Sequence, residues 1–172
     1  ADDCPAGIHE ARVMSRLGVS SSRVFNVGTL PEATRVKANT SLDTAMSLEV
    51  NSVCNAVMTR QAIDYYSFEA EQGQRIVVDC AAEGIDSKLK PVLIIADAKG
   101  ADLLVERRGG ALDFTAPETG TFIVKVHELT FNGGSEYFYR LALTGAAAGE
   151  TVPRLASTQN VSAFSWPPVG LV

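Results

Sequence analysis

The residue types that carry out chemistry are few in this chain and lie far apart. Its two histidines are His9 and His127, and neither belongs to a His-Glu-x-x-His zinc pair or a Gly-x-Ser-x-Gly nucleophile turn. Glu128 follows His127, but neighbouring residues of a strand point to opposite faces. The sequence therefore predicts no catalytic residue. An enzyme would need carboxylates that converge in a cleft, and the candidates are Asp64, Asp79, Glu83 and Asp86.

Metal-binding patterns are also weak. The segment Asp97-Ala98-Lys99-Gly100 begins like a calcium loop, but Lys99 stands where an acid is needed. Asp in the first position and Gly in the fourth are typical of a type I turn. We therefore expect a turn here, and we predict neither a metal nor a cofactor.

The three cysteines, Cys4, Cys54 and Cys80, are an odd number without metal-like spacing. Cys80 falls on the same side of a predicted strand as Ile76 and Val78, which favours a buried thiol used as a small apolar residue. A Cys54–Cys80 disulfide is the alternative, because the two cysteines lie on different predicted strands and their separation is not fixed by the sequence.

Composition excludes two classes of partner. The net charge is −5, whereas a nucleic-acid-binding face needs a basic stripe to neutralise phosphates. The chain contains no apolar run near the roughly 20 residues of a membrane span. We therefore expect a globular protein that neither binds nucleic acid nor inserts into a membrane.

Any site must be positioned by β-strands. Residues 46–144 contain short apolar runs with a period of two, separated by Gly, Pro, Asn and Asp. No stretch combines a helical period with helix caps. The pattern predicts an all-β fold, an antiparallel jelly-roll-like β-sandwich. Within it we expect a hairpin between residues 64–70 and 75–81, and another around Asn132-Gly133-Gly134-Ser135.

The segments that flank this sandwich have other compositions. Residues 1–29 contain two strand-like stretches, and residues 30–45 are rich in Pro, Thr, Asn and Ser, as in a linker or covering loop. Residues 145–172 form an extended tail in which 161–166 are strand-like. Two strands alone are marginally stable in water. We therefore expect the terminal strands to pair with each other, with the sandwich, or with a second copy in a strand-exchanged dimer, burying Val24, Phe25, Phe164 and Trp166.

In the order and spacing of its motifs, the region of residues 48–144 resembles the bacterial pre-peptidase C-terminal (PPC) domain. The matching segments are Asp64-Tyr65-Tyr66-Ser67-Phe68-Glu69, Gly73-Gln74-Arg75, Asp97 with Gly100, Phe114-Thr115-Ala116-Pro117, Gly120-Thr121-Phe122 and Tyr139-Arg140-Leu141. Residues 5–27 resemble the last strands of an immunoglobulin-like surface domain. These resemblances imply an immunoglobulin-like segment or strand extension at 1–29, a linker at 30–45 and a PPC-like sandwich at 46–144.

The chain also departs from the family. Some relatives hold calcium with acidic residues before the domain and with the Asp of the Asp-Tyr-x-x-Phe motif. Here Arg35 and Lys37 occupy the acidic segment, and only Asn39 and Asp64 remain. The resemblance thus implies that a tight calcium site is missing from this chain.

The resemblance implies a non-catalytic module for adhesion, targeting or spacing in a larger secreted or cell-envelope protein of a bacterium. Collagen-binding relatives present tyrosines on a strand where this chain has Lys125 and His127. We therefore predict Lys125 and His127 as the ligand-binding residues, with an extracellular polymer or surface protein as partner. A carbohydrate-binding module and an accessory domain of a secreted hydrolase are the alternatives.

Overall fold

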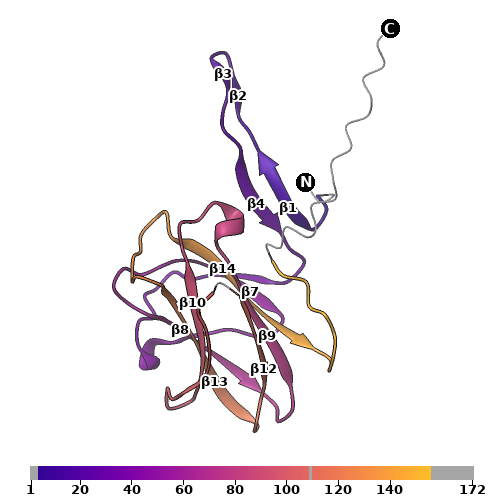
Figure 1. The fold of residues 1–172 in the computed structure, drawn as a ribbon, viewed down its shortest axis with the longest axis vertical. Helices are drawn as coiled ribbons and strands as arrows, with labels where there is room; N and C mark the ends of the chain where they lie inside the picture. Colours follow the sequence, from indigo (N-terminus) through magenta and orange to yellow (C-terminus); the bar gives the residue numbers. More distant parts are fainter. Residues whose placement is uncertain (1–3, 109, 156–172) are drawn as a thin grey trace.

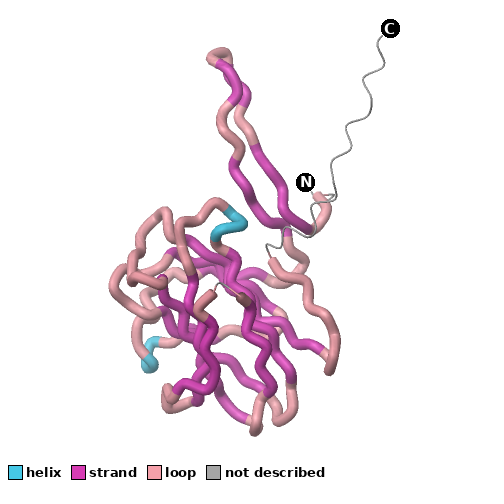
Figure 2. Tube along the Cα trace, in the orientation of Figure 1, coloured by secondary structure: helices cyan, strands magenta, loops and turns pink. Residues whose placement is uncertain are grey.

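Two five-stranded sheets pack face to face, and a β-hairpin projects from one end of them (Figure 1). The computed structural model describes residues 4–108 and 110–155. Helical structure in this part of the chain is limited to two short 3₁₀ turns, η1 (Leu42–Thr44) and η2 (Glu83–Ile85) (Figure 2). The predicted all-β sandwich is therefore confirmed. No helix of the described residues could span a membrane.

Each sheet is named here after its central strand. The β13 sheet has, in spatial order, β11 (Asp102–Glu106), β10 (Pro91–Asp97), β13 (Gly120–Glu128), β8 (Asp64–Ala70) and β6 (Met46–Ser47). The β14 sheet has β12 (Ala111–Thr115), β9 (Arg75–Ala81), β14 (Phe138–Ala146), β7 (Ser52–Val57) and β5 (Glu32–Thr34). The projecting hairpin contains β1 (Gly7–Ala11), β2 (Met14–Ser15), β3 (Gly18–Val19) and β4 (Arg23–Val27).

Consecutive strands mostly belong to opposite sheets, so both predicted hairpins are wrong. β8 lies in the β13 sheet and β9 in the β14 sheet, and the segment around Asn132–Ser135 likewise crosses from β13 to β14. The apolar side chains explain this arrangement. Phe68 of β8 and Ile76 of β9 both belong to the core cluster, and two sheets can enclose such residues between them.

Within the sandwich, β10 and β11 form a true hairpin, with Leu93 opposite Glu106 and Ile95 opposite Leu104. Asp97 closes it, because its side-chain Oδ1 accepts hydrogen bonds from the N–H groups of Lys99 (2.9 Å) and Ala101 (2.8 Å). The turn predicted at residues 97–100 is therefore confirmed.

The core lies between the two sheets. The period of two in the sequence predicts ten core residues, and nine of them are there: Phe68, Ile76, Val78, Phe114, Phe122, Val124, Val126, Tyr139 and Leu141. The exception is Ile94, which pairs with Lys125 on the outer face of the β13 sheet. Its neighbours Leu93 and Ile95 fill the core instead. A continuous apolar run such as 92–96 gives no alternation from which the inward face could be chosen.

Residues 30–45, predicted as a linker, contribute to the sandwich. β5 pairs with β7, and β6 just after this segment pairs with β8; both pairings are parallel. The sandwich is therefore antiparallel except at these two edges, each of which ends in a very short strand.

The hairpin and the tail meet the outer face of the β14 sheet. Arg140 donates to the carbonyl oxygen of Asn26 (2.5 Å), while Asp79 accepts from Arg154 (2.9 Å) and from the N–H of Leu155 (2.7 Å). β4 also contacts η2. The hairpin and residues 154–155 are thus held against the sandwich by side-chain hydrogen bonds at the hairpin base, whereas the strand pairing expected for residues 161–166 stays a prediction.

The burial expected for the terminal strands is only partly found. Val24 is half-buried, but Phe25 is 43% exposed, so the prediction for Phe25 is wrong. Residues 161–166, including Phe164 and Trp166, lie outside the described part of the chain.

Candidate functional site

Lys125 and His127 lie on the outer face of β13, between inward-pointing Val124 and Val126. The Lys125 side chain is largely buried at 11% exposure, and its Nζ donates to Asp102 Oδ1 and to the Gly100 carbonyl oxygen, both at 2.7 Å. Its ammonium group binds β11 and the preceding turn to β13, and the ligand-binding role of the pair stays a prediction.

His127 forms a flat aromatic surface with Phe131. Their ring centroids are 4.6 Å apart and the rings are tilted by 3°, while Phe131 is 43% exposed. The loop that carries Phe131 is held by Glu128, whose Oε2 accepts from the Thr130 hydroxyl (2.7 Å), the Thr130 N–H (2.7 Å) and the Asn132 N–H (3.0 Å). Burial alone raises the pKa of Glu128, but these hydrogen bonds and nearby His127 outweigh burial and lower it.

The two residues left from the family's calcium segment, Asn39 and Asp64, converge on a guanidinium group. Arg35 Nη1 lies 2.6 Å from Asp64 Oδ1, 2.8 Å from Asn39 Oδ1 and 3.0 Å from Thr59 Oγ1, and Nη2 donates to the Val57 carbonyl oxygen. The Asp64 side chain is fully buried. A built-in cation therefore occupies the point at which these oxygens meet.

Two tyrosine hydroxyls extend this cluster into the core. Tyr139 donates to Asp64 Oδ2 (2.8 Å), and the hydroxyls of Tyr139 and Tyr66 are 2.7 Å apart. Burial raises the pKa of both tyrosines, so both stay protonated and can act as donors. Asp64 and both tyrosines are buried inside the sandwich, which suits a structural role better than ligand binding.

The four carboxylates considered for an enzyme are not brought together. Asp64 is bound to Arg35, and Asp79 to Arg154 on the outer face of the β14 sheet. Asp86 accepts from the Val24 N–H (2.9 Å). Glu83 lines a small cavity beside Asp79, yet Asp79 is held there by its own cation. These acids stabilise different parts of the fold.

Cys54 and Cys80 are buried free thiols. They pair with the same residue, Leu141, from opposite sides of β14, so two strand spacings of about 4.8 Å separate their Cα atoms. That separation exceeds the reach of a disulfide, and the disulfide alternative is wrong. Burial raises the pKa of both thiols, which keeps them protonated and unreactive.

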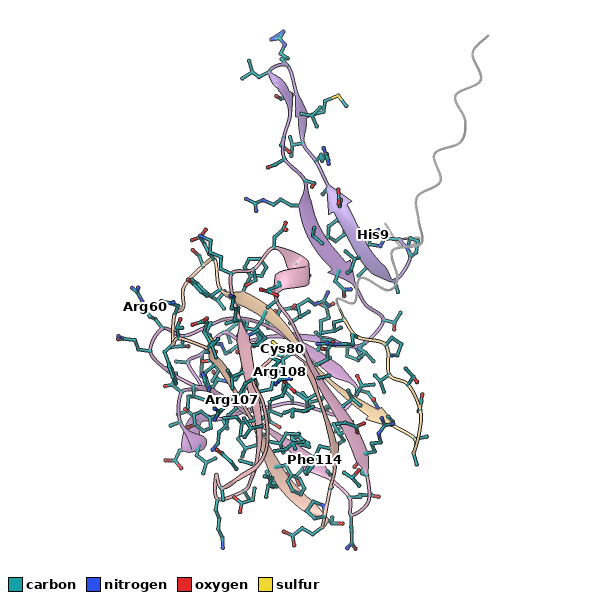
Figure 3. The ribbon with its side chains drawn as sticks, viewed as in Figure 1. His9, Arg60, Cys80, Arg107, Arg108 and Phe114 are labelled. Atoms are coloured by element: carbon teal, nitrogen blue, oxygen red, sulfur yellow. The ribbon has the colours of Figure 1, made fainter. Side chains whose placement is uncertain are left out.

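An open groove of about 900 Å³ lies at the hairpin base. One wall is β4 with η2, the floor comes from β5, β7 and β14, and the far wall is the segment 135–138. In Figure 3, His9 marks the projecting hairpin, while Cys80 and Phe114 mark the sandwich below it. The groove lies where these two parts meet.

Charged residues of both signs line this groove in pairs. Arg140 contacts Glu32, which also accepts from Asn55 (2.8 Å), and Lys88 Nζ lies 2.9 Å from Glu136 Oε2. The Lys88 and Glu136 side chains are 60% and 66% exposed. They can therefore exchange their mutual contact for contacts with a ligand at little cost.

Apolar surface lies beside these charges. Val57, at the end of β7, is 43% exposed, and half-buried Phe138 pairs with it across β14. Sequence reasoning missed this groove, because its residues come from five separate segments. The one signal available was the alternation of β7 and β14, which places Val57 and Phe138 on the face away from the core.

The fold and the groove define an all-β sandwich module with an appended hairpin. No family model and no curated protein matches the chain. Among solved structures, the pre-peptidase C-terminal domain of collagenase from Bacillus anthracis is similar at 13% identity and a TM-score of 0.46, covering 67% of this chain and 99% of that one.

Two further structures are PliG proteins, periplasmic lysozyme inhibitors of g-type lysozyme. The Aeromonas hydrophila protein is 13% identical with a TM-score of 0.46, covering 59% of this chain and 97% of that one. The Salmonella Typhimurium protein is 15% identical with a TM-score of 0.37, covering 58% and 98%.

Proposed function

We propose that this chain is a non-catalytic binding module of a secreted or cell-envelope protein, and that the groove at the hairpin base holds a segment of an extracellular polymer. The observation that carries the proposal is the groove itself. Its volume of about 900 Å³ falls within the usual range of ligand sites, which combine apolar walls with a few polar groups. Val57 and Phe138 supply the apolar part, and Lys88 and Glu136 the polar part.

Binding fits the groove better than catalysis does. Glu32 is bound to Arg140, Glu136 to Lys88, and Asp86 to a backbone N–H. A general acid or base needs a proton-transfer position next to the substrate and a pKa near the working pH. These carboxylates are already engaged by cations or an N–H group, so they suit recognition by hydrogen bonds and charge better than proton transfer.

The adhesion or targeting role is supported by the sequence resemblance to domains that are appended to secreted proteases and surface proteins. The strand bearing Lys125 and His127 is the second candidate site. The stacked His127–Phe131 pair favours it, because a flat, partly exposed aromatic surface can pack against a sugar ring or a peptide side chain.

The proposal can be tested on an array of polysaccharides and extracellular proteins. The groove variant combines Val57→Ser, Lys88→Ala and Glu136→Ala; it removes one exposed ion pair and one exposed aliphatic side chain, so net charge and fold are kept. We expect binding of the polymer that the wild-type chain selects to weaken by roughly tenfold or more. Unchanged binding would refute the groove.

A matched control combines Glu10→Ala, Arg12→Ala and Leu103→Ser. It also removes an exposed ion pair and an exposed aliphatic side chain, but outside the groove, and should bind as wild type. The pair Lys125→Ala and His127→Ala forms the third arm. Loss of binding in this arm alone would move the site to β13.

A further inference from the structure

The β13 sheet ends at β11 with an open edge. Within the described residues β11 pairs with β10 alone, and no other backbone hydrogen bond involves residues 102–106. The register with β10 is irregular at Leu103 and regular over 104–106. A bulge makes an edge less suited to pairing where it lies. The N–H and C=O groups of 104–106 are therefore the part of this edge that a further strand can pair with.

The side chains of β11 are apolar and incompletely covered. Leu104 lies opposite the core residue Ile95 and so points inward between the sheets, yet it is 37% exposed. Val105 lies opposite Ile94 on the outer face and is 41% exposed. The sandwich is thus not closed on this side. An additional strand beside β11 would cover Leu104 on one face and Val105 on the other.

Two arginines follow this strand. Arg107 and Arg108 are exposed, and among the described residues neither guanidinium group has a hydrogen-bond or ion-pair partner. They line a concavity of about 370 Å³ with Val105 and Glu106, and the Glu106 carboxylate accepts a hydrogen bond from the Arg108 backbone N–H (2.5 Å). In Figure 3 both arginines lie on the sandwich, away from the hairpin that carries His9. In a chain of net charge −5, these two cations are suited to carboxylates of another molecule.

A second copy of the chain fits this edge poorly. In a two-fold dimer of antiparallel strands, one residue of β11 lies opposite its own copy. If that residue is Leu104, Asp102 lies opposite Glu106, and like charges in this position are destabilising. If it is Val105, Leu104 lies opposite the charged Glu106, and the favourable charge contact would take Asp102 from the lysine that now holds it.

We propose that β11 binds an extended peptide segment of a partner protein as an additional antiparallel strand, with acidic residues at the N-terminal end of that segment. β10, β13 and β8 pair antiparallel in this sheet. Arg107 and Arg108 follow the C-terminal end of β11, so they meet the N-terminal end of an antiparallel strand. Main-chain hydrogen bonds hold a strand added in this way, and side chains at alternate positions select it. The site uses residues 104–108, and it depends neither on the groove nor on Lys125 and His127.

A nuclear magnetic resonance titration of the isotope-labelled chain with the peptide Glu-Glu-Val-Thr-Val-Thr-Val tests this proposal. We expect the backbone resonances of residues 104–108 to shift, while those of the groove residues 135–138 do not. The reversed peptide Val-Thr-Val-Thr-Val-Glu-Glu and the analogue that begins with Lys-Lys should each bind at least about threefold more weakly. The double variant Arg107→Glu, Arg108→Glu should prefer the Lys-Lys peptide to the Glu-Glu peptide.

Two N-methylated peptides separate strand addition from simple attraction between charges. Successive N–H groups of a strand point to opposite sides, so methylation of alternate nitrogens removes the donors on one side only. One of the two methylated peptides should therefore lose binding while the other keeps it. The groove variant Val57→Ser, Lys88→Ala, Glu136→Ala should bind the unmethylated peptide as the wild type does, so this proposal and the groove can fail separately.

Three results would overturn the proposal. The first is the absence of shifts at residues 104–108 at millimolar concentrations of the Glu-Glu peptide. The second is equal affinity for the Glu-Glu and Lys-Lys peptides, which would assign no role to Arg107 and Arg108. The third is equal behaviour of the two methylated peptides, which would show that the peptide does not pair with β11.

Discussion

The guanidinium of Arg35 neutralises a carboxylate that has no access to water. Asp64 is fully buried, and the Arg35 side chain is 10% exposed. An ion pair of this kind contributes little net stability compared with apolar packing, but the loss of one partner leaves an uncompensated charge. Asn39, Thr59 and the Tyr139 hydroxyl complete the hydrogen bonds, which ties the segment 35–39 to the sandwich.

We therefore expect Arg35→Ala to lower the free energy of unfolding by about 3–5 kcal/mol. Lys37→Ala, at an exposed position two residues away, should change it by less than about 0.5 kcal/mol. Urea denaturation of the two variants measures this difference. Equal stability of Arg35→Ala and the wild type would show that Asp64 is not held by Arg35.

The same cluster predicts the response to calcium. Calcium needs six to eight oxygen ligands, whereas the oxygens of Asp64 and Asn39 already face the Arg35 cation. Titration calorimetry should detect no binding, and the melting temperature should not change when calcium is added. Micromolar affinity, or a large rise in melting temperature, contradicts this prediction.

The lowered pKa of Glu128 predicts that the stability of the fold depends on pH. Its pKa lies below the ordinary value of 4.5 because hydrogen bonds to the carboxylate outweigh burial. A lowered pKa in the folded state means that the stabilisation is present above the unfolded value and is lost as pH falls through the folded value. Unfolding measured between pH 6 and pH 3 should lose less stability for Glu128→Gln than for the wild type. Parallel pH profiles would assign no such role to Glu128.

The structural role of a residue could be predicted from the sequence where its immediate neighbours in the chain determine that role. Asp97 and Gly100 define their turn through neighbouring N–H groups, and strict alternation assigned Val124 and Val126 to the core. The environment of Lys125 could not be predicted, because Asp102 reaches it from another strand. The Arg35–Asp64 ion pair could not be predicted for the same reason, because the sequence shows the two charges but not that they lie close together.

At the scale of elements, alternation predicts strands but not their partners. The four-residue connection between β8 and β9 suits a hairpin as well as a crossing between sheets. The choice depends on whether Phe68 and Ile76 must lie beside each other on one sheet or face each other across the core, and burial of ten strands in two layers favours the second. The groove, built from five segments, depends on this choice and was therefore beyond prediction.

A substitution at Val124 tests the register of β13, the central strand of its sheet. It is fully buried and pairs with Tyr66 on one side and Ile95 on the other. Val124→Asp places an unpaired carboxylate in the core at a cost of several kcal/mol, comparable to the stability of about 5–15 kcal/mol of a typical domain. We expect the sandwich to unfold in thermal scans, whereas Leu103→Asp at an exposed site should melt as the wild type. An unchanged melting temperature for Val124→Asp contradicts the register.

At the scale of the whole molecule, the sandwich is a rigid support for surfaces built by the terminal segments. β4 forms one wall of the groove, and Arg140, Asn26 and Asp86 fix this wall to the β14 sheet. A change in the hairpin would therefore alter the shape of the groove without disturbing the core. This division explains why the core was largely predictable, whereas the binding surface required the arrangement of distant segments.

Hydrogen–deuterium exchange of the chain, with and without the polymer selected on the array, tests the proposed binding site most directly. Bound polymer should slow exchange at backbone amides of residues 23–26, 86–88 and 135–138, which border the groove. Residues 123–127 of β13 should exchange as in the free chain. Protection confined to 123–127, or no protection near the groove at saturating polymer, would contradict the account.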